Sequence, residues 1–512
     1  MVAVWIGVAA LAAASPRAEA MRRREADWRV GPVVYQVLVD RFAPSSRLEA
    51  KRSLYGPPRR LRAWSDLPEP GSPVPELGVW SHELDFWGGD LQSLIGKLDH
   101  VRSLADVLYL NPIHDALTNH KYDATDWRRI SPEYGDWADF RSLARAVHAS
   151  GARLVLDGVF NHCGRSNPIF QEALANPASK RRSRFFFDDR YPAGYRAWAG
   201  VANLPEVRLE SADARRHLWN GSDSVVARYL KEGADGWRLD VAHELGPEFL
   251  AELTRAAHRH KSGSLVLGEV WNYPAGWTSV LDGLLNMFLG RVILELADGR
   301  LSPRQVGEAL NELVRDCGIE PLLRSWIVLG NHDTPRLATV LPDRAKRRFA
   351  QALQFALPGA PLIYYGDELG MQGGDDPRQR APMRWDLATE DNPDLQWVRR
   401  LVAVRRGLRA LRIGDFRAMR GERALAFLRT TERPLEAVVV VANPSEVGVE
   451  ETWIVPDGTL MGYTLLRDAL SGATARVLAG TLRATIPPRT VRVFAIDPEA
   501  RDRGQYKRMP EG

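Results

Sequence analysis

Cysteine and lysine are scarce in this 512-residue chain, which contains two cysteines and eight lysines. Cys163 and Cys317 cannot build a disulfide framework, and neither stands in a zinc-binding spacing, so we interpret Cys163 as a packed thiol. Arginine therefore supplies most of the positive charge, and the net charge is only +5. The basic residues are scattered among acidic ones, which indicates a compositional preference for arginine and disfavours a nucleic-acid-binding surface.

An apolar run near the start, residues 2–14, is too short to cross a membrane, so no membrane span is expected. Ala18-Glu19-Ala20 resembles a signal-peptidase site, although no positive charge precedes the run. Two interpretations of residues 1–30 stay open. Residues 1–20 are a signal peptide of a secreted or periplasmic protein, or translation of a cytoplasmic protein starts at Met21. The sequence does not indicate an oligomeric state.

From Val33 to about Leu411, short apolar segments alternate with longer amphipathic ones. Strand-helix alternation repeated about eight times predicts an α/β fold, a (β/α)8 TIM barrel over residues 31–412. The sixth strand is poorly marked and is expected near Leu284–Leu289. The other seven strands are expected in VVYQVLVDRF, ADVLYLNPI, RLVLDGVF, DGWRLDV, SLVLGEV, SWIVLGNHD and PLIYYGDE. Helices are expected at residues 137–150, 214–232, 248–260, 302–316 and 344–357.

Two further regions accompany the predicted barrel. The segment between Asn161 and Leu209 is too long for a simple loop, and we interpret residues 163–208 as a small inserted domain after the third strand that forms one wall of a cleft. Helical periodicity stops after Arg412, and short runs rich in Val, Thr and Leu follow. They predict a C-terminal antiparallel β-sandwich over residues 413–498, before a charged, frayed tail at 499–512.

Four of the predicted strands deliver a carboxylate at the C-terminal end: Asp157, Asp240, Glu269 and Asp333. In a parallel barrel these ends meet at one face, which is where TIM-barrel active sites lie. Carboxylates that converge in a cleft of that kind favour glycoside hydrolysis. The alternative, a buried structural ion pair, accounts for one such acid more readily than for four.

Alternation along GWRLD places Arg238 and Asp240 on the face that points into the barrel mouth. An arginine beside a carboxylate favours the ionised form, which a nucleophile requires, so Asp240 fits that role. Glu269 ends an apolar strand and is followed by Val270 and Trp271. That setting favours a protonated carboxyl, which can donate to a leaving group.

Six motifs of the chain resemble those of the α-amylase family of glycoside hydrolases, in order and spacing: HKYDATDW, DGVFNH, GWRLDVAHE, GEVW, NHD and YYGDELGM. The resemblance covers about Val33 to Arg412 strongly and implies a retaining mechanism on α-linked glucans. It implies that Asp240 is the nucleophile, Glu269 the general acid/base and Asp333 the transition-state stabiliser. By the same resemblance, the subsite that distorts the reacting sugar is lined by Arg238, His162, His332 and Tyr122, which Asp157 orders.

Motif details are closest to the cyclomaltodextrinase, neopullulanase and maltogenic amylase branch. HKYD, Trp271 and Glu244 agree with that branch, whereas His243 stands where the branch usually has Asn and LPEVR replaces its usual motif at residues 204–208. The branch's extra N-terminal sandwich is not expected, because the barrel begins near Val33. Further substrate-binding residues expected from the resemblance are His243, Glu244, Trp271 and Arg336.

Calcium is the one metal that the resemblance raises. Gly88-Gly89-Asp90 matches relatives that bind calcium after the first strand, but the loop DRFAPSSRLEAKR has lost most of their oxygen-bearing side chains. Asn161 matches the other common calcium position, whose usual histidine partner is replaced by Glu244. We therefore expect no obligatory cofactor. If calcium is bound, Asp90 and Asn161 are its expected ligands.

The expected substrate is an α-glucan with mainly α-1,4 bonds, as in maltooligosaccharides, cyclodextrins or starch. A transglycosylase or α-glucosidase on the same scaffold stays open, because the hallmark motifs do not separate water from sugar as the acceptor. A non-catalytic glucan-binding protein is a remote alternative, since such relatives lose catalytic carboxylates and this chain has all three.

Overall fold

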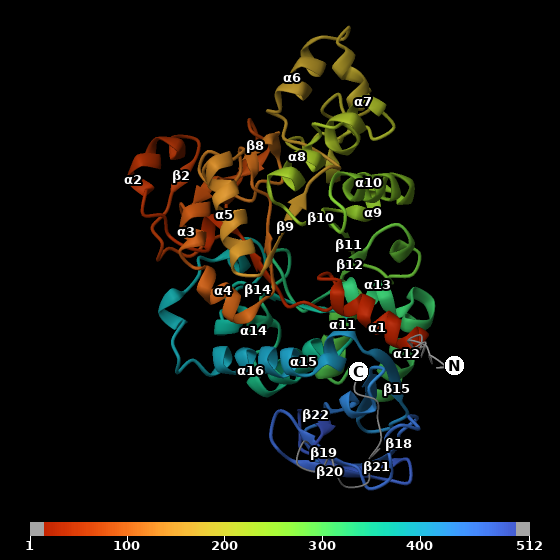
Figure 1. The fold of residues 1–512 in the computed structure, drawn as a ribbon. Helices are drawn as coiled ribbons and strands as arrows, with labels where there is room; N and C mark the ends of the chain where they lie inside the picture. Colours follow the sequence, from red (N-terminus) through yellow and green to blue (C-terminus); the bar gives the residue numbers. More distant parts are fainter. Residues whose placement is uncertain (1–14, 498–512) are drawn as a thin grey trace, which may run out of the picture.

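Eight parallel strands close into a barrel in the computed structural model, which describes residues 15–497 (Figure 1). The strands are β1 (Val34–Val37), β6 (Val107–Leu110), β9 (Arg153–Gly158), β10 (Gly236–Leu239), β11 (Leu265–Val270), β12 (Gly283–Asn286), β13 (Trp326–Val328) and β14 (Ala360–Tyr364). Their order around the barrel is β1-β14-β13-β12-β11-β10-β9-β6. The predicted TIM barrel is confirmed. Its weakly marked sixth strand lies at β12 and ends just before a helix begins at Met287.

Most strand residues are buried, because side chains fill the barrel interior and helices cover the outside. This double burial explains why the strands appear in the sequence as nearly continuous apolar runs. The covering helices include α5 (Trp137–Ala149), α8 (Val225–Glu232), α10 (Pro247–His260), α11 (Met287–Ala297), α12 (Pro303–Cys317), α15 (Arg344–Ala356) and α16 (Pro393–Gly407).

The single helix predicted at residues 214–232 is wrong. The chain instead forms α7 (Ala212–Arg215), a π-helical turn (Arg216–Asn220) and then α8. The break follows from the run Asn-Gly-Ser-Asp-Ser at residues 220–224, which favours turns over helix. Ser224 ends the break by capping α8, since its hydroxyl accepts a hydrogen bond from the Ala227 N–H.

Two long connections, rather than one, rise from the C-terminal ends of the strands. The expected insertion after β9 carries α6 (Pro168–Ala175). A second long connection joins β1 to α3 (Leu91–Ile95) and was not predicted, because its proline- and arginine-rich sequence shows neither a strand nor a helix period. Its short elements are η1 (Val39–Arg41), α2 (Leu48–Lys51), η2 (Arg52–Tyr55), β2 (Arg60–Leu61), β3 (Pro73–Val74), β4 (Val79–Trp80), η3 (Ser81–Leu84) and β5 (Asp85–Phe86). Figure 1 shows α2, β2 and α6 at the end of the molecule away from the C-terminal strands.

The C-terminal region is an antiparallel β domain with a core of its own around the buried Trp453. Its strands pair in the order β15-β16-β17-β22-β19-β20-β21-β18. Their bounds are β15 (Asp415–Met419), β16 (Leu425–Thr430), β17 (Val438–Asn443), β18 (Val449–Ile454), β19 (Leu465–Asp468), β20 (Thr474–Leu478), β21 (Thr481–Ile486) and β22 (Thr490–Ile496). The buried Arg429 on β16 joins this domain to the barrel, because its guanidinium donates to the Ala356 carbonyl at 2.9 Å.

A short helix, α1 (Pro16–Ala26), packs against the barrel through the buried Met21. It contains the Ala18–Ala20 motif. The apolar run at residues 2–14 and the predicted tail at 499–512 lie outside the described residues. Within residues 15–497, no helix has the length and hydropathy needed to cross a membrane.

A buried ion pair supports the segment that carries Tyr122. Lys121 has a left-handed φ of 67° and its ammonium lies 3.0 Å from the Glu133 carboxylate, with both side chains fully buried. Arg59, from the β1–α3 connection, contacts the same carboxylate at 2.6 Å. Burial alone raises the pKa of Glu133, but Lys121 and Arg59 outweigh it and lower the pKa to about 2.

The lowered pKa of Glu133 predicts that the fold loses stability in acid and that part of this loss depends on Glu133. Glu133 stabilises the fold above its unfolded pKa of about 4.5, and this contribution, on the order of 3 kcal/mol, is lost as the pH falls toward 2. We expect Glu133→Gln to be less stable than the wild type at pH 6 and to show a smaller loss of Tm between pH 5 and pH 3. Thermal unfolding across this pH range measures the effect, and equal pH slopes for the two proteins would contradict it.

Candidate active site

One buried arginine holds three carboxylates together at the mouth of the barrel. Arg238, on β10, donates through Nη1 to Asp157 Oδ1 at 2.8 Å and to Asp240 Oδ1 at 3.0 Å. Its Nη2 forms an ion pair with Glu269 Oε2 at 2.7 Å. The three acids come from the neighbouring strands β9, β10 and β11. One guanidinium therefore fixes the positions of Asp240 and Glu269 relative to each other.

Three carboxylates around one guanidinium leave an excess of negative charge. Burial raises the pKa of Asp240 well above its ordinary value, and the charges of Glu269 and Asp157 raise it further, while Arg238 opposes the shift. Burial also raises the pKa of Asp157. The sequence-based expectation that Arg238 favours ionised Asp240 identifies the right interaction, but burial outweighs it. Asp240 and Asp157 thus hold protons more tightly than isolated aspartates would.

Val241, directly after Asp240, has a left-handed backbone with φ 40° and ψ 46°. This conformation costs a β-branched residue on the order of 1–3 kcal/mol. It directs the Val241 N–H to Glu269 Oε2 at 3.0 Å. The other carboxylate oxygen of Glu269 accepts a hydrogen bond from the Trp271 indole at 2.9 Å. Both oxygens of Glu269 are therefore oriented by defined donors.

His332 is a neutral imidazole with an assignable proton. Burial lowers the pKa of His332 well below its ordinary value, and the charges of Arg380 and Arg238 add to this effect. Gln36 Nε2 lies 2.9 Å from Nδ1, which makes Nδ1 the acceptor and leaves the proton on Nε2. That nitrogen lies 2.5 Å from the Tyr122 hydroxyl and 3.2 Å from Asp333 Oδ2.

Tyr122 stands between His332 and the carboxylate cluster. Its ring is parallel to the imidazole, with an interplanar angle of 2° and centroids 5.5 Å apart. Its hydroxyl donates to Asp157 Oδ2 at 2.9 Å. Tyr122 thereby joins the β9–β11 acids to the segment after β13 that carries Asp333, and it presents an aromatic face to the cleft.

His162 has two buried ring nitrogens without a hydrogen-bond partner within residues 15–497. Burial and the charge of His120 lower its pKa to about 3, so the imidazole is neutral at physiological pH. The ring lines the cleft and stacks against Trp198 at 5.2 Å. Buried polar atoms without partners are costly, and ligand hydroxyls would satisfy these two.

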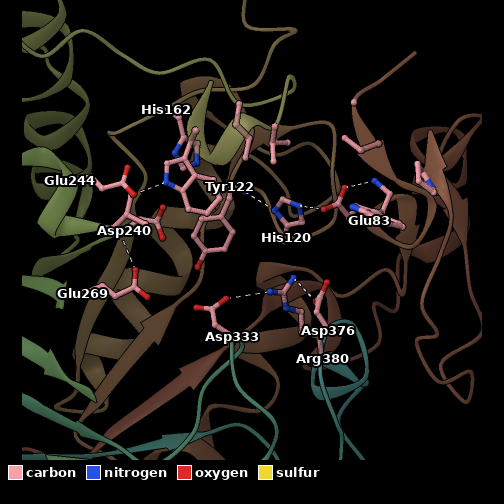
Figure 2. Close-up of a pocket in the computed structure, with 18 of the residues that line it drawn as sticks. Glu83, His120, Tyr122, His162, Asp240, Glu244, Glu269, Asp333, Asp376 and Arg380 are labelled. Carbon is pink, nitrogen blue, oxygen red and sulfur yellow. Dashed lines mark hydrogen bonds and ion pairs between the residues drawn. The ribbon is translucent and has the colours of Figure 1, made fainter. Parts of the chain in front are cut away.

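Glu244 lies on the same side of the pocket as Asp240 and Glu269 (Figure 2). Asn161 Nδ2 donates to Glu244 at 3.0 Å and the Trp198 indole donates to it at 3.1 Å. His243 Nε2 is 3.8 Å from the same carboxylate. Trp198, from the inserted domain, therefore connects His162 with Glu244 along one wall of the cleft.

The opposite side of the cleft carries a second polar network. Arg380 forms ion pairs with Asp333 at 3.3 Å and with Asp376 at 3.0 Å. His120 is 3.4 Å from the Glu83 carboxylate. Figure 2 shows these four residues, His120, Glu83, Asp376 and Arg380, on the side of the pocket opposite Asp240 and Glu269.

A cleft of about 680 Å³ unites these groups. Of the residues expected from the sequence, it is lined by Asp240, Glu269, Asp333, Tyr122, His162, His243, Glu244 and Trp271. Asp157, Arg238 and His332 lie beneath this lining and contact it. Arg336 is placed elsewhere: it is fully buried and its guanidinium donates to the Tyr365 carbonyl at 2.6 Å.

Sequence reasoning missed six polar or aromatic residues that line the cleft: Trp80, Glu83, His120, Trp198, Asp376 and Arg380. His120 belongs to the HKYD motif and is the one of the six that this motif could have identified. The others stand in connections without a periodic pattern, far in sequence from their partners. No local signal in the sequence places them at the site.

The donor set at Asp90 does not fit a calcium ion. The buried Lys51 ammonium lies 2.9 Å from Asp90 Oδ2 and 2.9 Å from the Glu133 carbonyl, and 3.4 Å from the Gly88 carbonyl. A positive charge of the protein itself therefore occupies this oxygen-lined position. Asn161 is also engaged, through its amide with Glu244. Among residues 15–497, no group of three or more His, Cys, Asp or Glu side chains is arranged to hold a metal ion.

Comparisons with known proteins agree with this geometry. The model of the alpha amylase catalytic domain matches residues 36–397. A cyclomaltodextrinase of Geobacillus thermopakistaniensis is 31% identical over 92% of this chain and 78% of its own. Neopullulanase 2 of Thermoactinomyces vulgaris is 29% identical over 90% of this chain and 77% of its own.

A solved structure of similar extent is the cyclic alpha-maltosyl-(1→6)-maltose hydrolase of Arthrobacter globiformis in complex with its cyclic sugar. It has a TM-score of 0.77 and 28% identity, and the match covers 92% of this chain and 99% of that one. The carboxylates at the strand ends, the barrel and these matches lead to one conclusion: the chain belongs to the α-amylase family and is a glycoside hydrolase.

Proposed function

We propose that the protein is a retaining hydrolase of α-glucosidic bonds in short maltooligosaccharides, linear or cyclic. The observation that carries the proposal is the contact of one guanidinium, that of Arg238, with both Asp240 and Glu269. This shared contact keeps the two carboxyls close, which suits the separation of about 5–5.5 Å of retaining glycosidases. Similarity to a cyclomaltodextrinase and to a cyclic maltosyl-maltose hydrolase supports the choice of substrate.

In the proposed reaction the ionised form of Asp240, which Arg238 favours against the effect of burial, attacks the anomeric carbon while Glu269 donates its proton to the departing glycosidic oxygen. The bond to the leaving sugar breaks as the bond to Asp240 forms. Glu269, now ionised, then takes a proton from water, and the hydroxide oxygen displaces Asp240 to complete hydrolysis. Asp333 faces the positive charge that develops on the sugar, at a position that His332 and Arg380 hold.

The substrate-binding roles follow from what each side chain presents to the cleft. Tyr122 offers an aromatic face for the reacting sugar, and His162 offers a neutral imidazole for its hydroxyls. His332 acts from beneath, where it contacts Tyr122 and Asp333. On the side of the leaving group, the half-exposed Trp271 offers a second platform beside Glu269, to which its indole donates. Because both imidazoles have lowered pKa values, we assign no step to their protonated forms.

The roles of Asp240 and Glu269 can be separated by chemical rescue. Asp240→Asn and Glu269→Gln should each lose several orders of magnitude in kcat on maltooligosaccharides. With an aryl maltoside, whose leaving group needs no protonation, Glu269→Gln should regain glycosyl transfer, and azide should complete the turnover because an anionic nucleophile needs no general base. Two successive displacements predict the α-anomer of the glycosyl azide.

The contrary outcome is equally specific. If azide rescues Asp240→Asn on the aryl maltoside and leaves Glu269→Gln inactive, the two roles are reversed. A β-glycosyl azide from Glu269→Gln would contradict the covalent intermediate on Asp240. The Ile454→Ala variant, changed at an exposed side chain of the C-terminal domain, serves as the control for handling and folding.

Calcium is not obligatory in this proposal, because Lys51 supplies the positive charge at Asp90. EDTA should leave both the Tm and the activity of the wild type unchanged. Lys51→Met should lower the Tm, since it leaves the buried Asp90 carboxylate without its partner, a loss of about 3–5 kcal/mol in comparable pairs. Lys180→Met, at an exposed position, is the matched control. A calcium-reversible fall in the wild-type Tm after EDTA would show the assignment to be wrong.

The strained backbone at Val241 should lower the stability of the fold and raise the activity. Val241→Gly removes the left-handed penalty, whereas Val241→Ala removes the same side-chain atoms beyond Cβ and keeps part of the strain. We expect the glycine variant to have the higher Tm of the two and the lower kcat, because the turn that aligns Asp240 with Glu269 becomes less rigid. Melting curves and steady-state kinetics on one maltooligosaccharide test this, and a lower Tm for glycine than for alanine would refute it.

A further inference from the structure

The two sides of the cleft can be assigned to the two parts of a substrate. In the proposed function the leaving sugar lies beside Glu269, the proton donor on β11. In the closed order of eight strands, β11 stands directly across the barrel from β1. The part of the substrate that stays on Asp240 therefore extends toward the β1–α3 connection. In Figure 2, Glu83 of that connection lies on the side of the pocket opposite Asp240 and Glu269.

A β-hairpin of this connection forms the wall at that end. Its strands are β3 and β4, and the hydrogen bonds Gly78 N–Val74 O at 2.9 Å and Ser81 N–Ser72 O at 2.8 Å hold it closed. The hairpin residues that line the cleft are Pro73, Val74, Pro75, Gly78, Val79 and Trp80. Two prolines restrict its backbone, so the wall is preorganised.

The base of the hairpin is fixed to the residues that hold Asp333. His82 Nδ1 accepts from the Gly71 N–H at 2.9 Å, which leaves Nε2 to donate to Asp376 at 3.2 Å. Asp376 is paired with Arg380, which in turn contacts Asp333. A chain of direct contacts thus runs from the base of the hairpin to Asp333.

The tip of the hairpin meets the inserted domain on the other side. Gly78 has a φ of +68°, and a methyl group at its Cα would lie 3.1 Å from the Asn203 nitrogen and 3.7 Å from the Ala202 carbonyl carbon. Asn203 is itself buried and donates to Asp123 at 3.1 Å. The hairpin therefore bridges from the segment after β14 to the inserted domain and roofs this end of the cleft.

From these contacts we infer that the β3–β4 hairpin limits how many sugar units of a linear chain can lie on the retained side, so that the enzyme cuts linear maltooligosaccharides at a fixed distance from the non-reducing end. This inference rests on the proposed function. The cleft volume of about 680 Å³ falls in the range of about 300–1,000 Å³ that encloses one small ligand. Trp80, which is 49% exposed, offers an indole face as the end wall for the last sugar.

An enzyme limited in this way differs from one that cuts inside long chains. A chain that continued past the non-reducing end of the site would have to pass through the hairpin, whose two anchors lie on both sides of the cleft. The fragment held on Asp240 should therefore have one length, whatever the length of the substrate. No such limit applies to the number of sugar units on the leaving side of the cleft.

Reducing-end-labelled maltotetraose, maltopentaose and maltohexaose provide the first test. The first labelled product should be shorter than its parent by the same number of units for every substrate. Maltohexaose with a benzylidene group on its non-reducing sugar should be cut about 100-fold more slowly than the unblocked sugar, because the bulky group displaces the chain from the reacting position. Random labelled products, or equal rates on blocked and unblocked sugars, would overturn the inference.

Removal of the wall is the second test. Replacing residues 74–79 by a short Gly-Ser linker opens the roof, and Trp80→Ala is a milder variant in case the first fails to fold. The readout is the ratio of rates on blocked and unblocked maltohexaose, which a general loss of activity does not change. We expect this ratio to rise at least tenfold in the linker variant and to stay at the wild-type value in Ile454→Ala.

A ratio unchanged by both hairpin variants would overturn the inference while the proposed function stands. Absence of hydrolysis of every unblocked α-glucan by the wild type would overturn the two together.

Discussion

The buried guanidinium of Arg238 is the interaction on which the site depends. Asp157, Asp240 and Glu269 lie on three neighbouring strands of the barrel, where the low-dielectric interior would make three unpaired carboxylates prohibitively costly. Arg238 contacts all three and is itself fully buried. Its position follows from strand alternation in GWRLD, which turns Arg238 inward with Asp240 and leaves Trp237 for the core. The two-residue alternation of side chains along this strand therefore places both the charged cluster of the site and the aromatic side chain of the core.

Arg238 cannot neutralise three charges, and the surroundings reflect this imbalance. The pKa of Asp240 is raised by burial and by its neighbours, and both nearby imidazoles are kept neutral by burial. Val241 accepts a strained backbone so that its N–H can reach Glu269. Strain and buried charge of this kind persist only where the surrounding structure over-determines them, which the closed barrel does.

The sequence predicted what local patterns encode. Apolar runs ending in an acid located β9, β10 and β11, and alternation gave the direction of Arg238. Contacts between distant segments carry no such signal: His82 meets Asp376 across 294 positions, and neither residue stands in a motif. Arg336 shows that sequence reasoning can also misplace a residue that lies close to a motif. It lies three residues after the catalytic motif, yet its guanidinium turns to the Tyr365 carbonyl, a partner that only the folded chain supplies.

The β1–α3 connection shows how one irregular segment can perform several tasks on a conventional barrel. Lys51, at its start, holds Asp90 by an ammonium where an oxygen cage could otherwise take a metal ion. Arg59 supports Glu133 and, through it, the turn before Tyr122. The hairpin beyond them lines the cleft. Loops can vary in sequence without disturbing the strands. The barrel can therefore keep its carboxylates in place while changes in this connection alter the stability of the fold and the shape of the cleft.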